Sequence, residues 1–122
     1  MSWNDKSNYE INKAVAKSYL PADCCFFFNK PDQQVLVEYG EEDGEALWEE
    51  FNPCIDIKYA WPIMKQYNID IEWPIEGECC GTVSRYMEGS MNVQKDFTDK
   101  EEALRCAMIV YLQSEGVACE DV

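Results

Sequence analysis

The chain has 122 residues, with 10 basic and 24 acidic side chains, no histidine and a formal net charge of −14. Such a charge disfavours direct binding to DNA, RNA or an anionic membrane, because phosphate groups would repel it. At 47% hydrophobic residues the chain is too apolar to remain disordered, and its length predicts a single domain, residues 1–122. No apolar run approaches the ~20 residues of a membrane span. The polar start has no signal-peptide core, so we expect a cytoplasmic protein.

The first predicted element is a helix that begins after Ser7. The sequence from Ser7 to Glu10 has the pattern of a capping box, in which each side chain bonds the backbone amide of the other residue. Apolar residues then recur at helical spacing until Pro21, which ends the helix. Residues 24–28 and 34–39 are rich in aromatic and β-branched residues and flank a turn signal, so they predict a β-hairpin.

The next stretch, residues 41–50, is strongly acidic and is interrupted by Gly44. We expect a loop or a short helical turn there, tethered to the body by Leu47, Trp48 and Phe51.

Asp56 is a plausible N-cap for a second helix that runs to about Tyr67. Pro62 falls inside this helix, where proline removes a hydrogen bond, so we expect a kink or a later start near Trp61. The expected apolar face contains Ile57, Ala60, Trp61, Met64 and Tyr67, with Trp61 in the core.

Residues 69–73 alternate between apolar and polar and predict a half-buried strand. Residues 79–86 predict another strand, with Gly81 as a potential bulge, and residues 91–93 predict a short edge strand.

A second capping-box pattern, Thr98-Asp99-Lys100-Glu101, predicts the start of the last helix. Gly116 is the expected stop, followed by a frayed tail from 117 to 122. The order of elements predicts an α+β fold with an antiparallel sheet of about four to five strands and three helices, the first, central and C-terminal.

Seven cysteines, an odd number, and the lack of an export signal predict reduced thiols. Two vicinal pairs, Cys24-Cys25 and Cys79-Cys80, raise the alternative of a metal site. Zinc ligands are normally two to four residues apart, and neighbouring residues of a strand point to opposite sides. We therefore expect no metal and no cofactor, and we interpret the cysteines as small apolar packing residues.

Several segments, in this order, resemble the NinX-type proteins encoded by lambdoid and related phages, a family without an assigned activity. The segments are Glu10-Ile11-Asn12-Lys13-Ala14-Val15-Ala16, Phe51-Asn52-Pro53-Cys54, Ala60-Trp61-Pro62-Ile63, Asn68-Ile69-Asp70-Ile71 and the stretch from Ala103 to Leu112. The resemblance implies a phage or prophage origin, expression in a bacterial cytoplasm and an accessory role. It supplies no catalytic residue.

The composition also argues against an enzyme. Without histidine the chain lacks the commonest general base and metal ligand. The glycines are scattered and form no phosphate-binding loop. Cys106 beside Arg105 is the nearest approach to an activated nucleophile, but its position in the last helix favours core packing. We therefore predict a protein without catalytic residues.

We expect a binding protein whose partner is a basic host or phage protein. Because net charge also serves solubility, the acidic stretch has a simpler interpretation as a solvated surface. An alternative is an acidic decoy that imitates DNA phosphates and inhibits a host nucleic-acid-binding or defence protein, which requires carboxylates fixed in a row. Self-association through the edge near residue 92 stays open. The candidate partner-binding residues are Glu41, Glu42, Asp43, Glu45, Trp48, Glu49 and Glu50.

Overall fold

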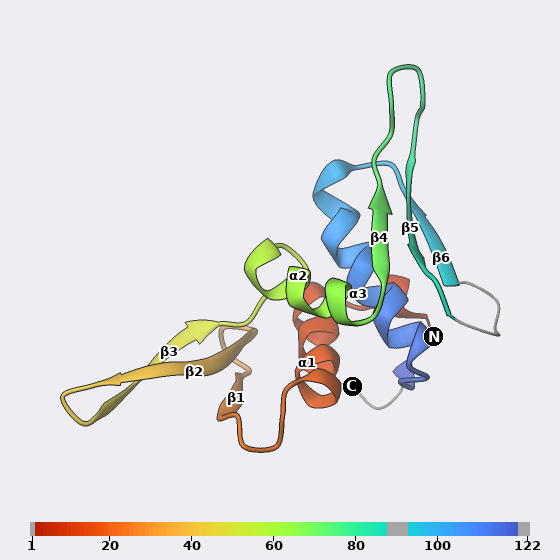
Figure 1. Ribbon diagram of the computed structural model, residues 1–122. Coiled ribbons are helices and arrows are strands. Elements are labelled where there is room, and N and C mark those ends of the chain that lie inside the picture. The colour runs from red at the N-terminus through yellow and green to blue at the C-terminus, as the bar shows by residue number, and fades with distance from the viewer. Residues whose placement is uncertain (1, 88–92, 120–122) are drawn as a thin grey trace.

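The computed structural model describes residues 2–87 and 93–119 (Figure 1). Over these residues the protein is α+β, with three α-helices and two three-stranded antiparallel sheets. The helices are α1 (Asn8–Tyr19), α2 (Ile57–Gln66) and α3 (Ala103–Ser114), with short 3-10 turns η1 (Trp3–Asp5) and η2 (Lys100–Glu102). The first sheet contains β1 (Phe26–Asn29), β2 (Gln34–Glu42) and β3 (Glu45–Glu50), and the second contains β4 (Ile69–Glu72), β5 (Gly81–Arg85) and β6 (Val93–Phe97).

The expected single sheet of four to five strands is therefore divided into two sheets. In each, the strands lie in sequence order and pair with their chain neighbours. After β3 the chain forms α2 before it reaches β4, and α2 lies between the two sheets (Figure 1). Each sheet consists of three strands that are consecutive in the chain, and β3 and β4 do not pair.

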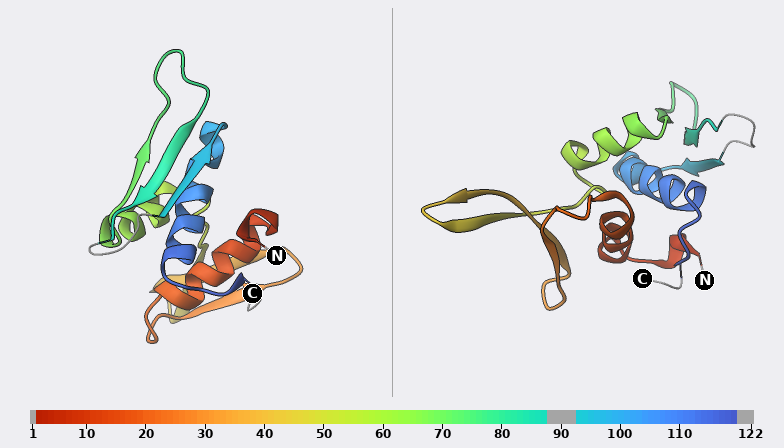
Figure 2. Two further views of the ribbon diagram at one scale, coloured as in Figure 1. Left: turned by 90° about the vertical axis from the view of Figure 1, so that its right-hand side faces the viewer. Right: turned by 60° about the horizontal axis from the view of Figure 1, so that its bottom comes forward.

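Helix α3 is the centre of the core. It covers one face of the second sheet and also contacts α1 and α2 (Figure 2). Its residues from Cys106 to Leu112 are all buried, which is expected for a helix surrounded by other elements. Around it, Tyr19, Tyr67 and Tyr111 pack edge to face, with the rings of Tyr67 and Tyr111 4.9 Å apart.

The sequence signals for two helix starts are confirmed. The Ser7 hydroxyl accepts from the Glu10 amide (3.2 Å), and the Glu10 carboxylate accepts from the Ser7 amide (3.3 Å), which completes the capping box of α1. Asp56 caps α2 by accepting from the Lys58 amide at 3.0 Å.

The start of the last helix differs from the expected capping box. Asp99, rather than Thr98, is the capping residue, and it begins η2 by accepting from the Glu101 amide at 2.9 Å. Helix α3 follows from η2 without a side-chain cap of its own. Its predicted stop at Gly116 is confirmed, with a left-handed φ of 72°.

The tail after Gly116 is not frayed where it is described. The Val117 amide donates to the Leu112 carbonyl (3.0 Å), and Cys119 is buried. Residues 120–122 lie outside the described part of the chain.

The inward face of α2 was predicted in part, because Ala60 and Met64 of the expected face are buried and Tyr67 packs against the core, whereas Ile57 and Trp61 do not face inward. Ala60, Ile63 and Met64 are buried, whereas Ile57 and Trp61 are exposed. Pro62 lies inside the helix, which neither starts late nor ends there. Its ring and the preceding turn at Lys58 are solvent-exposed, so water can bond the carbonyl that Pro62 leaves without a helical donor.

The second sheet has a continuous register, so the bulge expected at Gly81 is absent from the described pairing. Glycine is required there for a different reason. A Cβ at Gly81 would lie 2.4 Å from the Phe97 ring and 2.6 Å from the Glu72 carbonyl oxygen. Of the expected edge strand at 91–93, Met91 and Asn92 lie outside the described residues, and Val93 begins β6.

Candidate partner-binding site

The acidic stretch is an ordered β-hairpin, so the expected loop or helical turn is wrong. Strands β2 and β3 pair antiparallel and are joined by the two-residue turn Asp43-Gly44. Both turn residues have positive φ (51° and 81°), as a type I′ turn requires. The hairpin projects away from the helices as a two-stranded arm (Figures 1 and 2).

Four of the candidate carboxylates, which we call the tip carboxylates, lie at the end of this arm. All are exposed, and they are Glu41, Glu42, Asp43 and Glu45. Glu42 and Glu45 are direct cross-strand partners, an arrangement of like charges that destabilises a sheet. The chain from residue 31 to residue 57 contains no lysine or arginine to offset this repulsion.

The tip carboxylates do not form a single row. Glu41 pairs with Ala46, one position from the Glu42–Glu45 pair. Because adjacent residues of a strand point to opposite faces, Glu41 lies on one face of the arm and Glu42 and Glu45 lie on the other. The tip therefore presents negative charge on both faces.

The remaining two candidate carboxylates lie at the base of the arm and both accept hydrogen bonds. Glu49 accepts from the Lys58 ammonium at 2.7 and 2.9 Å and from the Tyr59 hydroxyl, which ties β3 to α2. The Glu50 carboxylate accepts from the Asn52 side chain at 3.3 Å. The structure thus separates the predicted set into an exposed tip and a bonded base.

Trp48 lies between these two groups. It is 40% exposed, and its ring packs edge to face on Phe27 of β1, with centroids 5.0 Å apart. Its direct partner on β2 is Glu38, a residue that the sequence interpretation missed. Alternation along residues 35–38, with Val35 and Val37 buried, is the signal that places Glu38 on the outer face.

The Asp43-Gly44 pair is the sequence signal that would have identified the hairpin. An Asp-Gly pair between two stretches of strand-forming residues is typical of type I′ hairpins. The high local density of glutamate, which is uncommon in strands, obscured it.

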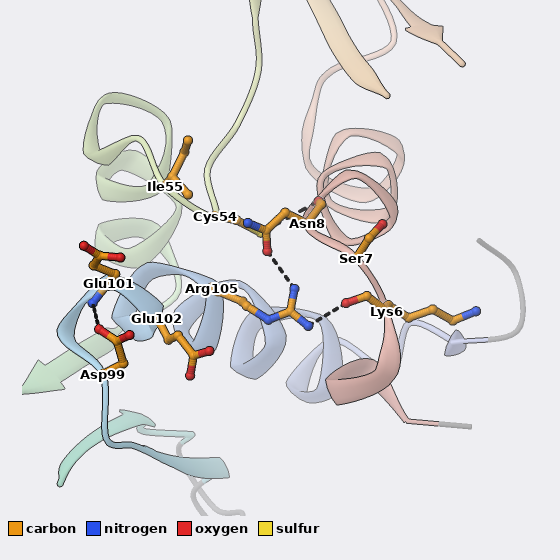
Figure 3. Close-up of a pocket in the computed structure, with 9 residues that line it drawn as sticks. All are labelled: Lys6, Ser7, Asn8, Cys54, Ile55, Asp99, Glu101, Glu102 and Arg105. Carbon is orange, nitrogen blue, oxygen red and sulfur yellow. Dashed lines mark hydrogen bonds between the residues drawn. The ribbon is translucent and has the colours of Figure 1, made fainter. Parts of the chain in front are cut away.

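A hollow of about 510 Å³ lies between α1, the segment at Cys54 and the start of α3 (Figure 3). Arg105 crosses it, and its guanidinium donates to Asn8 Oδ1 (2.7 Å) and to the Lys6 carbonyl (2.5 Å). The carboxylates of Asp99, Glu101 and Glu102 also line it. Because its arginine is engaged in the fold and its rim is acidic, the hollow is poorly suited to an anionic ligand.

The surroundings of three thiols, those of Cys25, Cys54 and Cys106, raise their pKa values. Burial raises the pKa of Cys54 to about 12 and also raises the pKa of Cys106. A hydrogen bond with Glu38 raises the pKa of Cys25. A catalytic cysteine requires a lowered pKa, so these sites oppose thiolate formation. Core packing of Cys106, which is 4% exposed, is confirmed.

Within residues 2–87 and 93–119, no group of three or more cysteine, aspartate or glutamate residues is arranged to hold a metal ion. None of the helices in this part of the chain is long and apolar enough to cross a bilayer. Comparisons with protein-family models, curated proteins and solved structures give no match.

Proposed function

We propose that the protein is a non-enzymatic accessory protein that binds a basic host or phage protein through the acidic tip of the β2–β3 arm. The resemblance to NinX-type proteins supports a phage or prophage origin and action in a bacterial cytoplasm. The observation that carries the proposal is the Glu42–Glu45 cross-strand pair, which places two exposed carboxylates directly opposite each other on an arm without any cation.

The like-charge pair gives the partner a specific energetic role. In the free protein, repulsion between Glu42 and Glu45 lowers the stability of the tip. A lysine or arginine of the partner placed between them converts this repulsion into attraction. Glu41 on the opposite face allows a basic groove to contact both sides of the arm. The net charge of −14 adds long-range steering, which increases the association rate at low salt.

The DNA-mimic decoy is the second candidate function. The carboxylates stand on paired strands, and fixed positions favour imitation of a phosphate backbone over a role in solubility alone. Their division between two faces is less suited to this role than a single row would be. The two candidates differ in whether DNA competes for the partner.

The test is a tagged pull-down from host bacterial lysate with elution in steps of rising salt. The tip variant combines Glu41→Gln, Glu42→Gln, Asp43→Asn and Glu45→Gln. A matched control removes the same number of charges from exposed sites elsewhere, with Asp5→Asn, Asp23→Asn, Glu101→Gln and Glu102→Gln. Glu49 and Glu50 stay unchanged, because Glu49 bonds α2 and Glu50 is bonded to the Asn52 side chain.

We expect a basic protein that the native chain and the control variant retain and that the tip variant loses. If both variants lose the captured protein equally, net charge alone explains the capture, and the proposed role of the tip carboxylates is refuted. DNA added to the captured complex then separates the candidates. Release by a duplex supports the decoy, and resistance to the duplex supports a partner surface unrelated to nucleic acid.

A further inference from the structure

A second surface, separate from the arm, carries exposed aromatic side chains. Trp61 of α2 is 57% exposed, and Trp73, directly after β4, is 51% exposed. Ile57, one turn before Trp61, is exposed as well. Large apolar side chains grouped on a surface mark interaction sites more often than isolated ones do. We call this group the α2–β4 surface.

Two hollows flank Trp61 on the α2–β4 surface. One measures about 420 Å³ and extends toward Tyr86, and the other measures about 240 Å³ and extends toward Trp73. Both are also lined by Ile69 and Asp70 of β4. The hollows therefore form a discontinuous groove along the junction of α2 and β4, with Trp61 between them.

Strand β4 borders this groove and is an edge strand of the second sheet. The Tyr86 amide donates to the Asn68 carbonyl (3.4 Å), which makes these residues a hydrogen-bonded pair. In an antiparallel pair the hydrogen-bonded positions alternate, so the backbone groups of Asp70 and Glu72 point to β5. Those of Ile69 and Ile71 point the other way, to the open edge. This edge is suited to accept another strand.

The charge beside the edge indicates the chemistry of the added strand. The exposed side chains of Asp70 and Glu72 lie on the face of the sheet opposite to the inward-facing Ile69 and Ile71. An added strand continues both faces, so it would place alternate residues near the two carboxylates and the others near the groove. A second copy of this chain would bring another −14 of charge to the interface, whereas a basic segment would be attracted.

We propose that the open edge of β4 binds an extended segment of a partner protein in which basic and apolar residues alternate. The segment pairs with the backbone of Ile69 and Ile71 and places apolar side chains in the hollows beside Trp61. Its lysine or arginine residues lie beside Asp70 and Glu72. This proposal does not depend on the function of the arm.

The test titrates the ¹⁵N-labelled protein with the acetylated, amidated peptide Lys-Val-Lys-Val-Lys-Val-Lys and follows amide chemical shifts. We expect the largest changes at Ile69 and Ile71. Trp61→Ala weakens binding about tenfold, because an exposed anchor of the groove is lost. Asp70→Asn combined with Glu72→Gln also weakens it. The matched control Tyr39→Ala, which removes an exposed aromatic side chain from the other sheet, leaves the affinity unchanged.

A peptide of the same sequence with backbone N-methylation at alternate residues separates strand pairing from simple charge attraction. The methylated peptide keeps the lysine side chains but lacks the backbone N–H groups that would donate hydrogen bonds to β4. We therefore expect it not to bind. Equal binding of the methylated peptide, or changes spread over the acidic arm, would overturn the proposal, as would no change at β4 with millimolar peptide. The tip variant of the arm should bind the peptide like the native protein.

Sedimentation of the protein alone tests the other occupant of this edge. We expect a monomer. If the protein is a dimer that Trp61→Ala dissociates, the α2–β4 surface binds a second copy of the chain. That result would refute the proposal that a basic segment of a partner protein binds there.

Discussion

The side chain of Asn12 donates to Asn52 Oδ1 at 2.7 Å and so links α1 to the segment that follows β3. Its own Oδ1 accepts from the Cys54 amide at 3.3 Å. Asn12 is only 3% exposed, and both ends of its amide group are satisfied. Two segments that are far apart in the sequence are thus joined by a buried polar side chain.

We predict that Asn12→Leu lowers the free energy of unfolding by about 1–3 kcal/mol, because it leaves the Cys54 amide without its partner. Urea denaturation measures the loss. A double-mutant cycle with Asn52→Leu should give a coupling energy of about 0.5–3 kcal/mol. Strictly additive effects would show that the contact contributes nothing to stability.

Gly81→Ala should destabilise the second sheet. The new methyl group would meet the Phe97 ring and the Glu72 carbonyl at distances below contact, and overpacking of this kind costs about 1–3 kcal/mol. Gly40→Ala is the matched control, since the nearest atom to a Cβ there is Leu47 Cδ1 at 4.0 Å. Thermal unfolding should show a clear decrease in Tm for the first variant only.

Glu42→Lys should make the arm more stable and less functional. The substitution converts the Glu42–Glu45 pair into an opposite-charge pair, which adds about 0.2–1 kcal/mol. It also removes charge from the proposed contact, so capture of a basic partner should fall. Glu41→Lys, which faces Ala46, should reduce capture without the gain in stability. Unchanged capture in both variants would contradict the proposed function.

Stability should decline at alkaline pH. Burial raises the pKa of Cys54 from 9.0 and that of Tyr111 from 10.0, each to about 12. Because the pKa of each group is higher in the folded state, the folded state holds the proton more tightly than the unfolded state does. The contribution of these groups to the free energy of unfolding is therefore complete below pH 9 and is lost as the pH rises toward 12. Denaturation midpoints measured from pH 8 to pH 12 test this decline.

Tyr111→Phe should flatten the part of that decline above pH 10. It should also cost about 0.5–1.5 kcal/mol at neutral pH, because the hydroxyl lies 3.0 Å from Ser18 Oγ. If the variant shows the same pH profile, groups other than Tyr111 cause the loss of stability at alkaline pH.

Amide exchange should alternate along β4 even without a partner. The amides of Asp70 and Glu72 donate to β5, whereas those of Ile69 and Ile71 face the open edge. We expect faster exchange at the two isoleucines, measured by NMR after transfer to D₂O. The opposite order would mean that the other backbone edge is the free one.

The parts of the fold that local chemistry determines were predictable. The capping residues of α1 and α2 act within one turn, so Ser7, Glu10 and Asp56 identify the helix starts without any tertiary information. The alternation at residues 69–73 likewise predicted a strand, and β4 covers the first four of these residues. Helix α3, with its long apolar stripe, was also expected.

Tertiary packing determined the rest. Nothing local distinguishes Trp61, which faces solvent, from Ile63, which is buried, because both fit an apolar helical stripe. The division into two sheets depends on the position of α2. In the candidate site, the sequence identified the cluster of acidic residues, but it did not predict the β-hairpin on which they lie. Only the pairing of β2 with β3 separates the tip carboxylates from Glu49, whose side chain bonds Lys58.

The division into two small sheets has a consequence for the behaviour of the protein in concentrated solution. Among the described strands, β1, β3, β4 and β6 all form sheet edges, which is a large share of open backbone for so short a chain. Open edges favour intermolecular pairing and, in the extreme, fibre growth. Mutual repulsion between highly negative molecules opposes such encounters. The acidity thus also gives colloidal protection, which weakens as acid or concentrated salt screens or neutralises the carboxylates.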